Sequence, residues 1–343
     1  MPELIDAHTH IYPRSYIERL KARTSIPRVT EHEGREYFVI FAHEEEAGPG
    51  GGRAFDAEYT SIELKLEHMD RNRIDRSVVS VGNPWLDPLD GDDSPQIARE
   101  LNAELAGYEA QTGGRIVGMG VLPSNRVADA VEVAREIATT DGLYGVIIGS
   151  RVCGRSLDDE ELEPLWQALA EIGLTLFLHP HYSAAADQLR GFGHALPVSV
   201  GFPFETTIAL ARFIFAGVLH RHPGLRMLVA HGGAAIPTLA GRMDAAWRSD
   251  PSTHARLPTP PSESIARLYL DLVLYQERTM RLAEDTAGIG KLSYGTDNPF
   301  SVSDPVVNGA ALESAFDTAK REAIAEGTRR LFRLPDEGSL ELP

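Results

Sequence analysis

The chain has 343 residues, of which 43% are hydrophobic, and its formal net charge at pH 7 is -17. A chain of this length can bury a large core, and barrels of alternating strands and helices often reach this size as one domain, so we expect residues 1–343 to form a single domain. The negative field repels phosphate backbones and anionic lipid, which makes nucleic acids and membranes poor partners.

The cysteine content and the apolar stretches bear on the compartment. Cys153 is the single cysteine, so no disulfide forms within the chain, which fits a reducing environment. The first apolar strand begins near Ile5, leaving no room for a signal peptide, and the longest apolar stretch, residues 208–219, is interrupted by Arg212. We therefore expect a cytoplasmic protein.

The first predicted strand ends in a pair of histidines, in the run Ile5-Asp6-Ala7-His8-Thr9-His10. Side chains alternate between the two faces of a strand, so His8 and His10 point the same way. Two imidazoles on one face can chelate a metal such as zinc, but a catalytic site needs further ligands and an open position. Alone the pair is a weak signal.

Residues 11–60 do not resemble a repeating strand–helix unit. They contain a short strand-like run, residues 37–41, and a glycine-rich loop, residues 48–52, with Arg53 at its end. We interpret the segment as an insertion that covers the mouth of the active site, and a surface loop is the alternative. Arg53 is placed to reach a substrate carboxylate.

From Ser61 onward, apolar strands alternate with amphipathic helices. Counting the first strand, about eight strands follow one another, and a final helix over residues 313–331 closes the ring. Strands buried on both faces and separated by helices predict a (β/α)8 TIM barrel. The competing doubly wound sheet is disfavoured because no G-x-G-x-x-G follows the first strand. The later predicted strands are residues 77–81, 116–122, 144–148, 174–178, 227–230, 268–275 and 292–296.

Five polar residues fall at the carboxyl ends of these strands, where barrel enzymes place their chemistry. His8 and His10 end the first strand, His179 the fifth, His231 the sixth and Asp297 the eighth. We predict that His8, His10, His179 and Asp297 hold one Zn2+, with Mn2+ or another divalent transition metal as the alternative. His231 is then free to act as a general acid or base, or it is a fourth nitrogen ligand.

Other candidates near the rim are weaker. Binuclear barrel hydrolases bridge two metals with a carboxylated lysine on the fourth strand, but no lysine lies between Lys65 and Lys291, which favours one metal. Cys153 follows the fourth strand and is more simply a small inert residue. His181 and His194 lie in loops, and neither is expected to be a ligand.

Seven segments together carry a family resemblance that covers nearly the whole chain. The sequence resembles the 2-amino-3-carboxymuconate-6-semialdehyde decarboxylase-like family of the amidohydrolase superfamily, and within it isoorotate decarboxylase and related aromatic-acid decarboxylases. The segments are Asp6-Ala7-His8-Thr9-His10, Asn83-Pro84-Trp85, Phe177-Leu178-His179-Pro180-His181-Tyr182, residues 201–207, Ala230-His231-Gly232-Gly233, Leu239-Ala240-Gly241-Arg242 and Gly295-Thr296-Asp297-Asn298-Pro299-Phe300.

The resemblance implies roles for residues at matching positions. It implies the same four metal ligands, a catalytic His231, and substrate contacts from Asn83 and Phe300. It also implies a homodimer in which Arg242 reaches the site from the neighbouring subunit, and it assigns substrate binding to Arg53 by a looser match. Asn298 stands where relatives carry histidine or tyrosine, which leaves the exact substrate open.

The chemistry implied is loss of CO2 without oxidation from an aromatic, pyrimidine or dienoic carboxylic acid. The substrate carbon is protonated first, and CO2 then departs. We favour Asp297 as proton donor for an aromatic substrate and His231 for an open-chain one. The alternative function is a mononuclear hydrolase of a lactone or amide, in which the same ligands and His231 serve a hydrolytic reaction.

Overall fold

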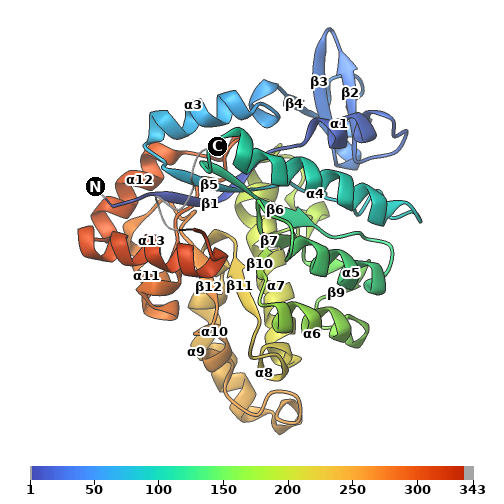
Figure 1. The fold of residues 1–343 in the computed structure, drawn as a ribbon. Coiled ribbons are helices and arrows are strands. Elements are labelled where there is room, and N and C mark those ends of the chain that lie inside the picture. The colour runs from blue at the N-terminus through green and yellow to red at the C-terminus, as the bar shows by residue number, and fades with distance from the viewer. Residues whose placement is uncertain (1, 336–343) are drawn as a thin grey trace.

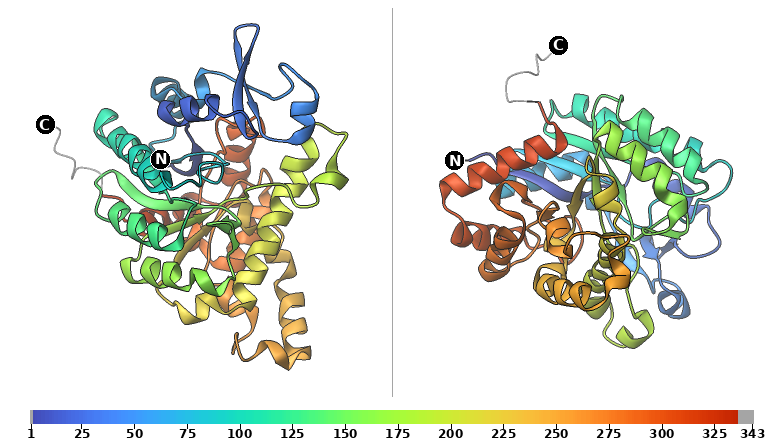
Figure 2. Two further views of the ribbon diagram at one scale, coloured as in Figure 1. Left: turned by 90° about the vertical axis from the view of Figure 1, so that its right-hand side faces the viewer. Right: turned by 90° about the horizontal axis from the view of Figure 1, so that it is seen from below.

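The computed structural model describes residues 2–335. Residue 1 and residues 336–343, the two ends of the range 1–343 expected as one domain, lie outside the described residues. Strands occupy the middle of the molecule and helices surround them (Figures 1 and 2).

Eight parallel strands form one sheet that follows the order of the chain. The strands are β1 (Ile5–His10), β5 (Arg76–Ser80), β6 (Ile116–Val121), β7 (Leu143–Ile148), β10 (Thr175–Leu178), β11 (Arg226–Val229), β12 (Tyr269–Asp271) and β13 (Leu292–Ser293). The two edges meet: Ala7 donates its backbone N–H to Tyr294, and His8 accepts from Thr296. The predicted (β/α)8 barrel is confirmed.

A helix follows each strand and covers the outside of the barrel. The eight main helices are α3 (Ile62–Asn72), α4 (Ser94–Gln111), α5 (Val127–Ile137), α6 (Glu163–Ile172), α7 (Phe202–Phe215), α9 (Ile236–Ser249), α11 (Glu277–Ala287) and α13 (Thr318–Phe332). Three further helices are the short α8 (Val218–Arg221) and α10 (Pro261–Ile265) and the longer α12 (Pro305–Ala315). Figure 1 shows α9 projecting from the body of the barrel.

The predicted final helix over residues 313–331 is in fact two helices. α12 ends at Ala315 and α13 begins at Thr318. Asp317 separates them and caps α13, because its side chain accepts the backbone N–H of Lys320 at 2.9 Å. A side chain of this kind ends one helical run and starts another.

Two predicted strands are shorter than expected. The apolar run 268–275 is a strand only at Tyr269–Asp271, and the run 292–296 only at Leu292–Ser293. Beyond Asp271 the chain leaves the sheet, and Val273, Leu274 and Tyr275 instead line a cavity described below. An apolar cavity wall and a buried strand give the same sequence pattern.

The segment between β1 and α3 forms a small unit above the barrel (Figure 1). It contains α1 (Arg14–Lys21), β2 (Arg28–His32), β3 (Arg35–Val39), α2 (Ala42–Glu46) and β4 (Arg53–Phe55). The three strands form an antiparallel sheet in the order β2-β3-β4. A separate short hairpin, β8 (Arg151–Val152) with β9 (Arg155–Ser156), follows β7.

One segment, Pro197–Phe215, is long and apolar enough to cross a membrane by length and composition. In the fold it is a π-helical turn followed by α7, the helix between β10 and β11. Its residues Leu210, Phe213 and Ile214 are buried against the barrel. A helix that packs on a sheet in this way passes the same test as a spanning helix.

Candidate metal centre

Four side chains from three strand ends converge on one point inside the barrel mouth. One ligand atom from each of His8, His10, His179 and Asp297 lies within 4.8 Å of the others, and all four residues are buried. The ring centroids of the three histidines are 4.9–5.1 Å apart. These are the residues that the sequence predicts as the metal ligands.

One donor atom of each of these side chains lacks a hydrogen-bond partner, and these four atoms mark the centre of the site. The Nε2 atoms of His8, His10 and His179 and the Oδ1 atom of Asp297 are buried and have no hydrogen-bond partner among the described residues. A buried polar atom without a partner is costly, so the missing partner is part of the design. Three imidazole nitrogens and one carboxylate oxygen make a donor set that fits zinc.

The other ring nitrogen of each histidine is already held. His8 Nδ1 contacts Asp271 Oδ2 at 2.5 Å, and the hydroxyl of Ser80 lies 3.0 Å from His10 Nδ1. His179 Nδ1 donates to the carbonyl of Pro180 at 2.9 Å. A partner on Nδ1 fixes the ring and leaves Nε2 as the electron-pair donor, as in metal sites generally.

Because side chains alternate between the two faces of β1, His8 and His10 lie on the same face. His8 and His10 face the barrel interior, while Thr9 between them faces away and accepts a hydrogen bond from Lys65 Nζ at 2.9 Å. The ammonium of Lys65 also contacts the carbonyl of Asn298 at 3.2 Å. Lys65 on α3 therefore ties the histidine pair to the turn that follows Asp297.

The buried charges of the site favour a positive charge at its centre. Burial would lower the pKa of His8, but the carboxylates of Asp271 and Asp297 outweigh it and raise that pKa to about 10. Burial likewise would raise the pKa of each aspartate, but the charge on His8 keeps both below the ordinary value. Burial lowers the pKa of His10 to about 4 and that of His179 well below its usual range. A bound metal ion would supply the positive charge that a proton on His8 otherwise provides.

Asp297 is held in an unusual backbone conformation. Its φ of +59° lies in the left-handed region, which a residue with a Cβ rarely adopts. The backbone N–H of Asp297 donates to the carbonyl of His8 at 2.8 Å, so the predicted ligand that follows β13 is bonded directly to a predicted ligand on β1. The strained turn directs the carboxylate back into the barrel.

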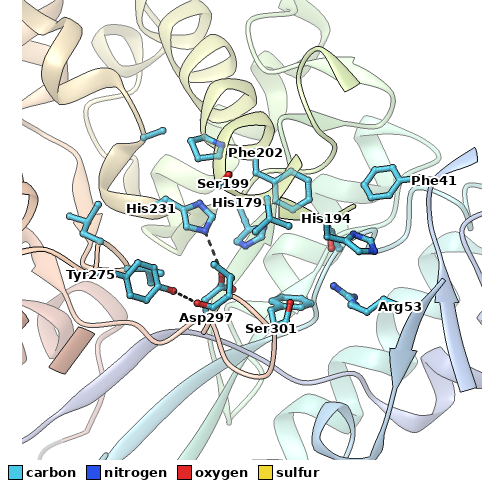
Figure 3. A pocket seen from close by; sticks show the side chains of 18 residues that line it. Phe41, Arg53, His179, His194, Ser199, Phe202, His231, Tyr275, Asp297 and Ser301 are labelled. Atoms are coloured by element: carbon cyan, nitrogen blue, oxygen red, sulfur yellow. Dashed lines mark hydrogen bonds and ion pairs between the residues drawn. The ribbon is translucent and has the colours of Figure 1, made fainter. Parts of the chain in front are cut away.

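His231 lies next to the four predicted ligands and is not one of them. Its Nε2 is 3.6 Å from Asp297 Oδ2, whereas Asp297 Oδ1 is 3.3 Å from the Nε2 atoms of both His8 and His10. Figure 3 shows the His231 ring directed at the Asp297 carboxylate. One oxygen of Asp297 thus faces the metal position and the other faces His231.

A cavity of about 400 Å³ opens over this centre. Its walls are mainly apolar, and Arg53, Asn83, His231 and Asp297 supply polar groups. A cavity of this size accommodates a small planar molecule. Its lining residues are Phe41, Arg53, Asn83, His179, His194, Val198, Ser199, Phe202, Pro203, His231, Ala234, Val273, Leu274, Tyr275, Asp297, Phe300, Ser301 and Val302.

Arg53 has N–H groups available to bind an anion or another hydrogen-bond acceptor. Its guanidinium carbon lies 4.9 Å from the ring centre of Phe300 and 5.4 Å from that of Tyr59. The Nε and Nη2 atoms are buried, and neither has a hydrogen-bond partner among residues 2–335. Aromatic faces attract the cation but leave its N–H groups free for a ligand.

The remaining predicted residues divide into those at the cavity and those away from it. Asn83 and Phe300 line it, and the Asn83 side chain donates to the His181 carbonyl at 2.9 Å. Arg242 is exposed on α9 and does not line the cavity of its own chain.

Of the weaker candidates, His194 lines the cavity, whereas His181 and Cys153 do not. Nε2 of His181 contacts Oδ2 of Asp87, and burial lowers the pKa of His181 to about 3. Burial raises the pKa of Cys153 to about 11, and its thiol donates to a backbone carbonyl outside the cavity.

Asp271 is an important residue that the sequence analysis missed. One carboxylate oxygen contacts His8, and the other accepts the backbone N–H of Gly232 at 2.9 Å, so Asp271 orients both a metal ligand and the turn that carries His231. The available signal was an aspartate inside an apolar strand, in Tyr269-Leu270-Asp271. Lys65 was missed because a lysine on a predicted helix normally faces solvent.

Comparison with known proteins agrees with the fold and identifies relatives of the chain. The amidohydrolase family model matches residues 5–334. The chain is 29% identical over 341 residues to the 2-amino-3-carboxymuconate-6-semialdehyde decarboxylase of Dictyostelium discoideum, covering 96% of this chain and 90% of that one. It is 32% identical to the IDCase of Metarhizium anisopliae in apo form, covering 98% of both chains with a TM-score of 0.90.

A more distant structure shares the fold and contains a metal. It is the 5-carboxyvanillate decarboxylase of Novosphingobium aromaticivorans, complexed with manganese and 4-hydroxy-3-methoxy-5-nitrobenzoic acid. The identity is 18%, the TM-score is 0.78, and the match covers 97% of this chain and 96% of that one.

We predict that His179→Ala abolishes metal binding whereas His181→Ala preserves it. The two histidines flank one proline, but only His179 directs a free Nε2 at the centre. Metal analysis of the purified, folded variants should find about one ion per chain in the wild type and in His181→Ala, and none in His179→Ala. Equal metal loss in both variants would contradict this assignment.

We also predict that Asp271→Asn weakens metal binding about 10- to 100-fold, because the His8 ring loses the carboxylate that orients it. Competition with a chelator measures the change in affinity. Asp244→Asn is the matched control, because Asp244 bonds Ser262 on the outside of the barrel. An unchanged affinity in Asp271→Asn would show that the contact plays no part in holding the metal.

Proposed function

The chain belongs to the amidohydrolase family, and we propose that it is a metal-dependent carboxy-lyase that removes CO2 without oxidation from an aromatic, pyrimidine or dienoic carboxylic acid. The observation that carries the proposal is the convergence of four partnerless donor atoms beneath a small apolar cavity that also contains Arg53. The decarboxylase names of the relatives support the same reaction class.

The donor set supports one metal ion, and we propose Zn2+, with Mn2+ or another divalent transition metal as the alternative. The residues that would hold it are His8, His10, His179 and Asp297. When bound, the ion polarises and orients the substrate carboxylate together with a neighbouring oxygen.

The protein side chains then supply the proton and the orientation. His231 and the Oδ2 atom of Asp297 face each other at 3.6 Å, so a proton can pass between them while Oδ1 stays directed at the metal position. One of the two transfers the proton to the ring carbon that bears the carboxylate. The electron pair of the carbon–carboxylate bond returns to the ring as CO2 leaves, which balances the reaction.

Binding of an acid requires local positive charge, because the chain as a whole carries a net charge of -17. Arg53 lies in the cavity with unpaired buried N–H groups, and Asn83 and Phe300 line the wall beside it. We propose that these three residues fix the plane of the substrate. The apolar walls exclude water around it.

We further propose a homodimer in which Arg242 enters the site of the neighbouring subunit. Arg242 lies on α9, which projects from the barrel, and its side chain has no hydrogen bond or ion pair within the described part of its own chain. Phe204 and Ile208 on α7 are 52% and 55% exposed, an apolar surface of the kind that subunits bury.

The lone free thiol, Cys153, suits a cytoplasmic enzyme.

The reaction class is tested by CO2 release from a panel of hydroxybenzoates, 5-carboxyuracil and a dienoic acid. We expect release from at least one member, loss of activity on chelation, and a decrease in kcat of roughly 10²- to 10⁴-fold in His231→Asn. His220→Asn, a change at an exposed histidine, is the control. Hydrolysis of a lactone or amide that depends on His231, without CO2 release, would instead establish the hydrolase alternative.

The position of Arg242 is tested by mixing two inactive variants. A heterodimer of His231→Asn and Arg242→Ala subunits contains one intact site only when the arginine acts across the interface. Mixing and reassociation should then restore about a quarter of the wild-type activity, since half of the dimers are mixed and each has one intact site. No recovery in dimers shown to be mixed would place Arg242 in its own subunit's site, or outside any site.

A further inference from the structure

A buried glutamate joins the two segments that face each other across the cavity mouth. Glu44 belongs to α2 of the small unit after β1, and it is only 2% exposed. Its Oε1 atom lies 2.9 Å from Nε2 of His194, which belongs to the loop between β10 and α7. Within the described structure this ion pair is the one polar side-chain link between residues 11–60 and residues 183–196.

The second carboxylate oxygen of Glu44 holds the cavity wall. Oε2 accepts the backbone N–H groups of Ile40 at 2.7 Å and Phe41 at 2.9 Å, and Phe41 lines the cavity. Burial would raise the pKa of Glu44, but the contact with His194 and these two N–H groups outweigh it and lower that pKa. The Glu44 carboxylate therefore bonds the backbone of its own segment through Oε2 and contacts the imidazole of the opposite loop through Oε1.

The loop on the other side depends on this contact. Gly191 and Gly193 have φ values of +93° and +56°, and a Cβ placed at either would meet no atom within 4 Å, so little packs against this part of the loop. Phe192 between them is 66% exposed. The left panel of Figure 2 shows this yellow-green loop reaching the blue segment around α2. His194 is the residue of this loop that contacts Glu44 across the cavity mouth.

The segment that Glu44 holds is connected to Arg53, the predicted substrate-binding arginine, through the sheet β2-β3-β4. Arg53 on β4 pairs with Phe38 on β3, and β3 runs directly into the segment that Glu44 holds. In Figure 3, Phe41, His194 and Arg53 lie together on the side of the cavity away from His231 and Tyr275. The contact therefore sets the geometry of the end of the cavity that is remote from the metal position.

We propose that Glu44 and His194 are positioning residues that hold the two walls of the cavity mouth together, and so fix Phe41 and Arg53 against the bound substrate. We call this pair the Glu44–His194 latch. The role in substrate binding rests on the proposed decarboxylase function, whereas the mechanical role does not. Neither residue touches the four predicted metal ligands, so the latch affects substrate binding more than the chemical step.

Two substitutions of His194 separate the latch from the mere presence of a side chain. The amide nitrogen of glutamine reaches approximately the position of a histidine Nε2, so His194→Gln retains a donor to Glu44. In His194→Asn the amide corresponds to Nδ1 and falls short of Glu44. We expect His194→Asn to raise KM roughly 10- to 100-fold with a small change in kcat, and His194→Gln to recover most of that loss.

A measurement without substrate tests the mechanical role. Arg190 lies in the loop and its side chain is 55% exposed, so trypsin can cut after it once the loop opens. We expect faster appearance of the peptide ending at Arg190 in His194→Asn and in Glu44→Gln than in the wild type or His194→Gln. The melting temperature should stay within a few degrees of the wild-type value. The metal content should stay at about one ion per chain.

The surface pair of His222 and Glu163 provides a matched control. Its contact of 2.8 Å resembles that of the latch, but neither residue lines the cavity. His222→Asn should leave both KM and the Arg190 cleavage rate as in the wild type.

Two results would overturn the proposal, and a third would overturn only the proposed decarboxylase function. Equal behaviour of His194→Asn and His194→Gln in both assays would exclude the latch. Faster cleavage with an unchanged KM would exclude the positioning role. If no acid is decarboxylated by any variant, the proposed function fails, and the cleavage rates alone still decide whether the latch exists.

Discussion

The structure depends on a group of buried charges that are balanced only when a cation is present. Two aspartates, Asp271 and Asp297, are buried on either side of His8 without an arginine or lysine in direct contact. An uncompensated buried charge is strongly destabilising, so this arrangement needs a positive charge at its centre. The Nε2 atoms of three imidazoles point at the same place, where a proton can satisfy one nitrogen but a metal ion can satisfy all three. The barrel supplies the rigidity, because the four predicted ligands lie at the carboxyl ends of three of its strands.

Local backbone strain is concentrated at the same rim. Trp85, His231, Tyr275 and Asp297 follow four different strands, and each has a φ between +52° and +59°. Such conformations cost on the order of 1–3 kcal/mol per residue and persist only where neighbours hold them. Asp271 holds the turn after His231 through Gly232, and His8 holds Asp297 through its carbonyl. The residues that surround the candidate metal position, Asp271 and His8, therefore also hold the strained turns, which couples the stability of the rim to the charge balance.

Much of the fold and of the metal centre was readable from the sequence because position along a strand fixes direction. His8 and His10 alternate with Thr9, and His179 and Asp297 directly follow apolar strands, so their convergence could be expected from a barrel. The strand over residues 268–275 was predicted too long, since Val273, Leu274 and Tyr275 are apolar for a different reason: they line the cavity. Asp271 escaped notice inside that run. Lys65 and Glu44 were unreadable, because burial of a charged side chain depends on partners distant in the sequence, Asn298 in one case and His194 in the other.

The overall acidity of the chain and the basic groups of the cavity act over different distances. Charges on the protein surface are screened beyond about 8 Å at physiological ionic strength. Inside the cavity, apolar walls exclude water, so the guanidinium of Arg53 attracts an acceptor far more strongly than an exposed arginine does. The acidic exterior therefore reduces the rate at which anions approach without preventing their binding. Recognition of a ligand therefore depends mainly on the groups at the cavity mouth and within it, such as Arg53, Phe41 and His194, and less on attraction from afar.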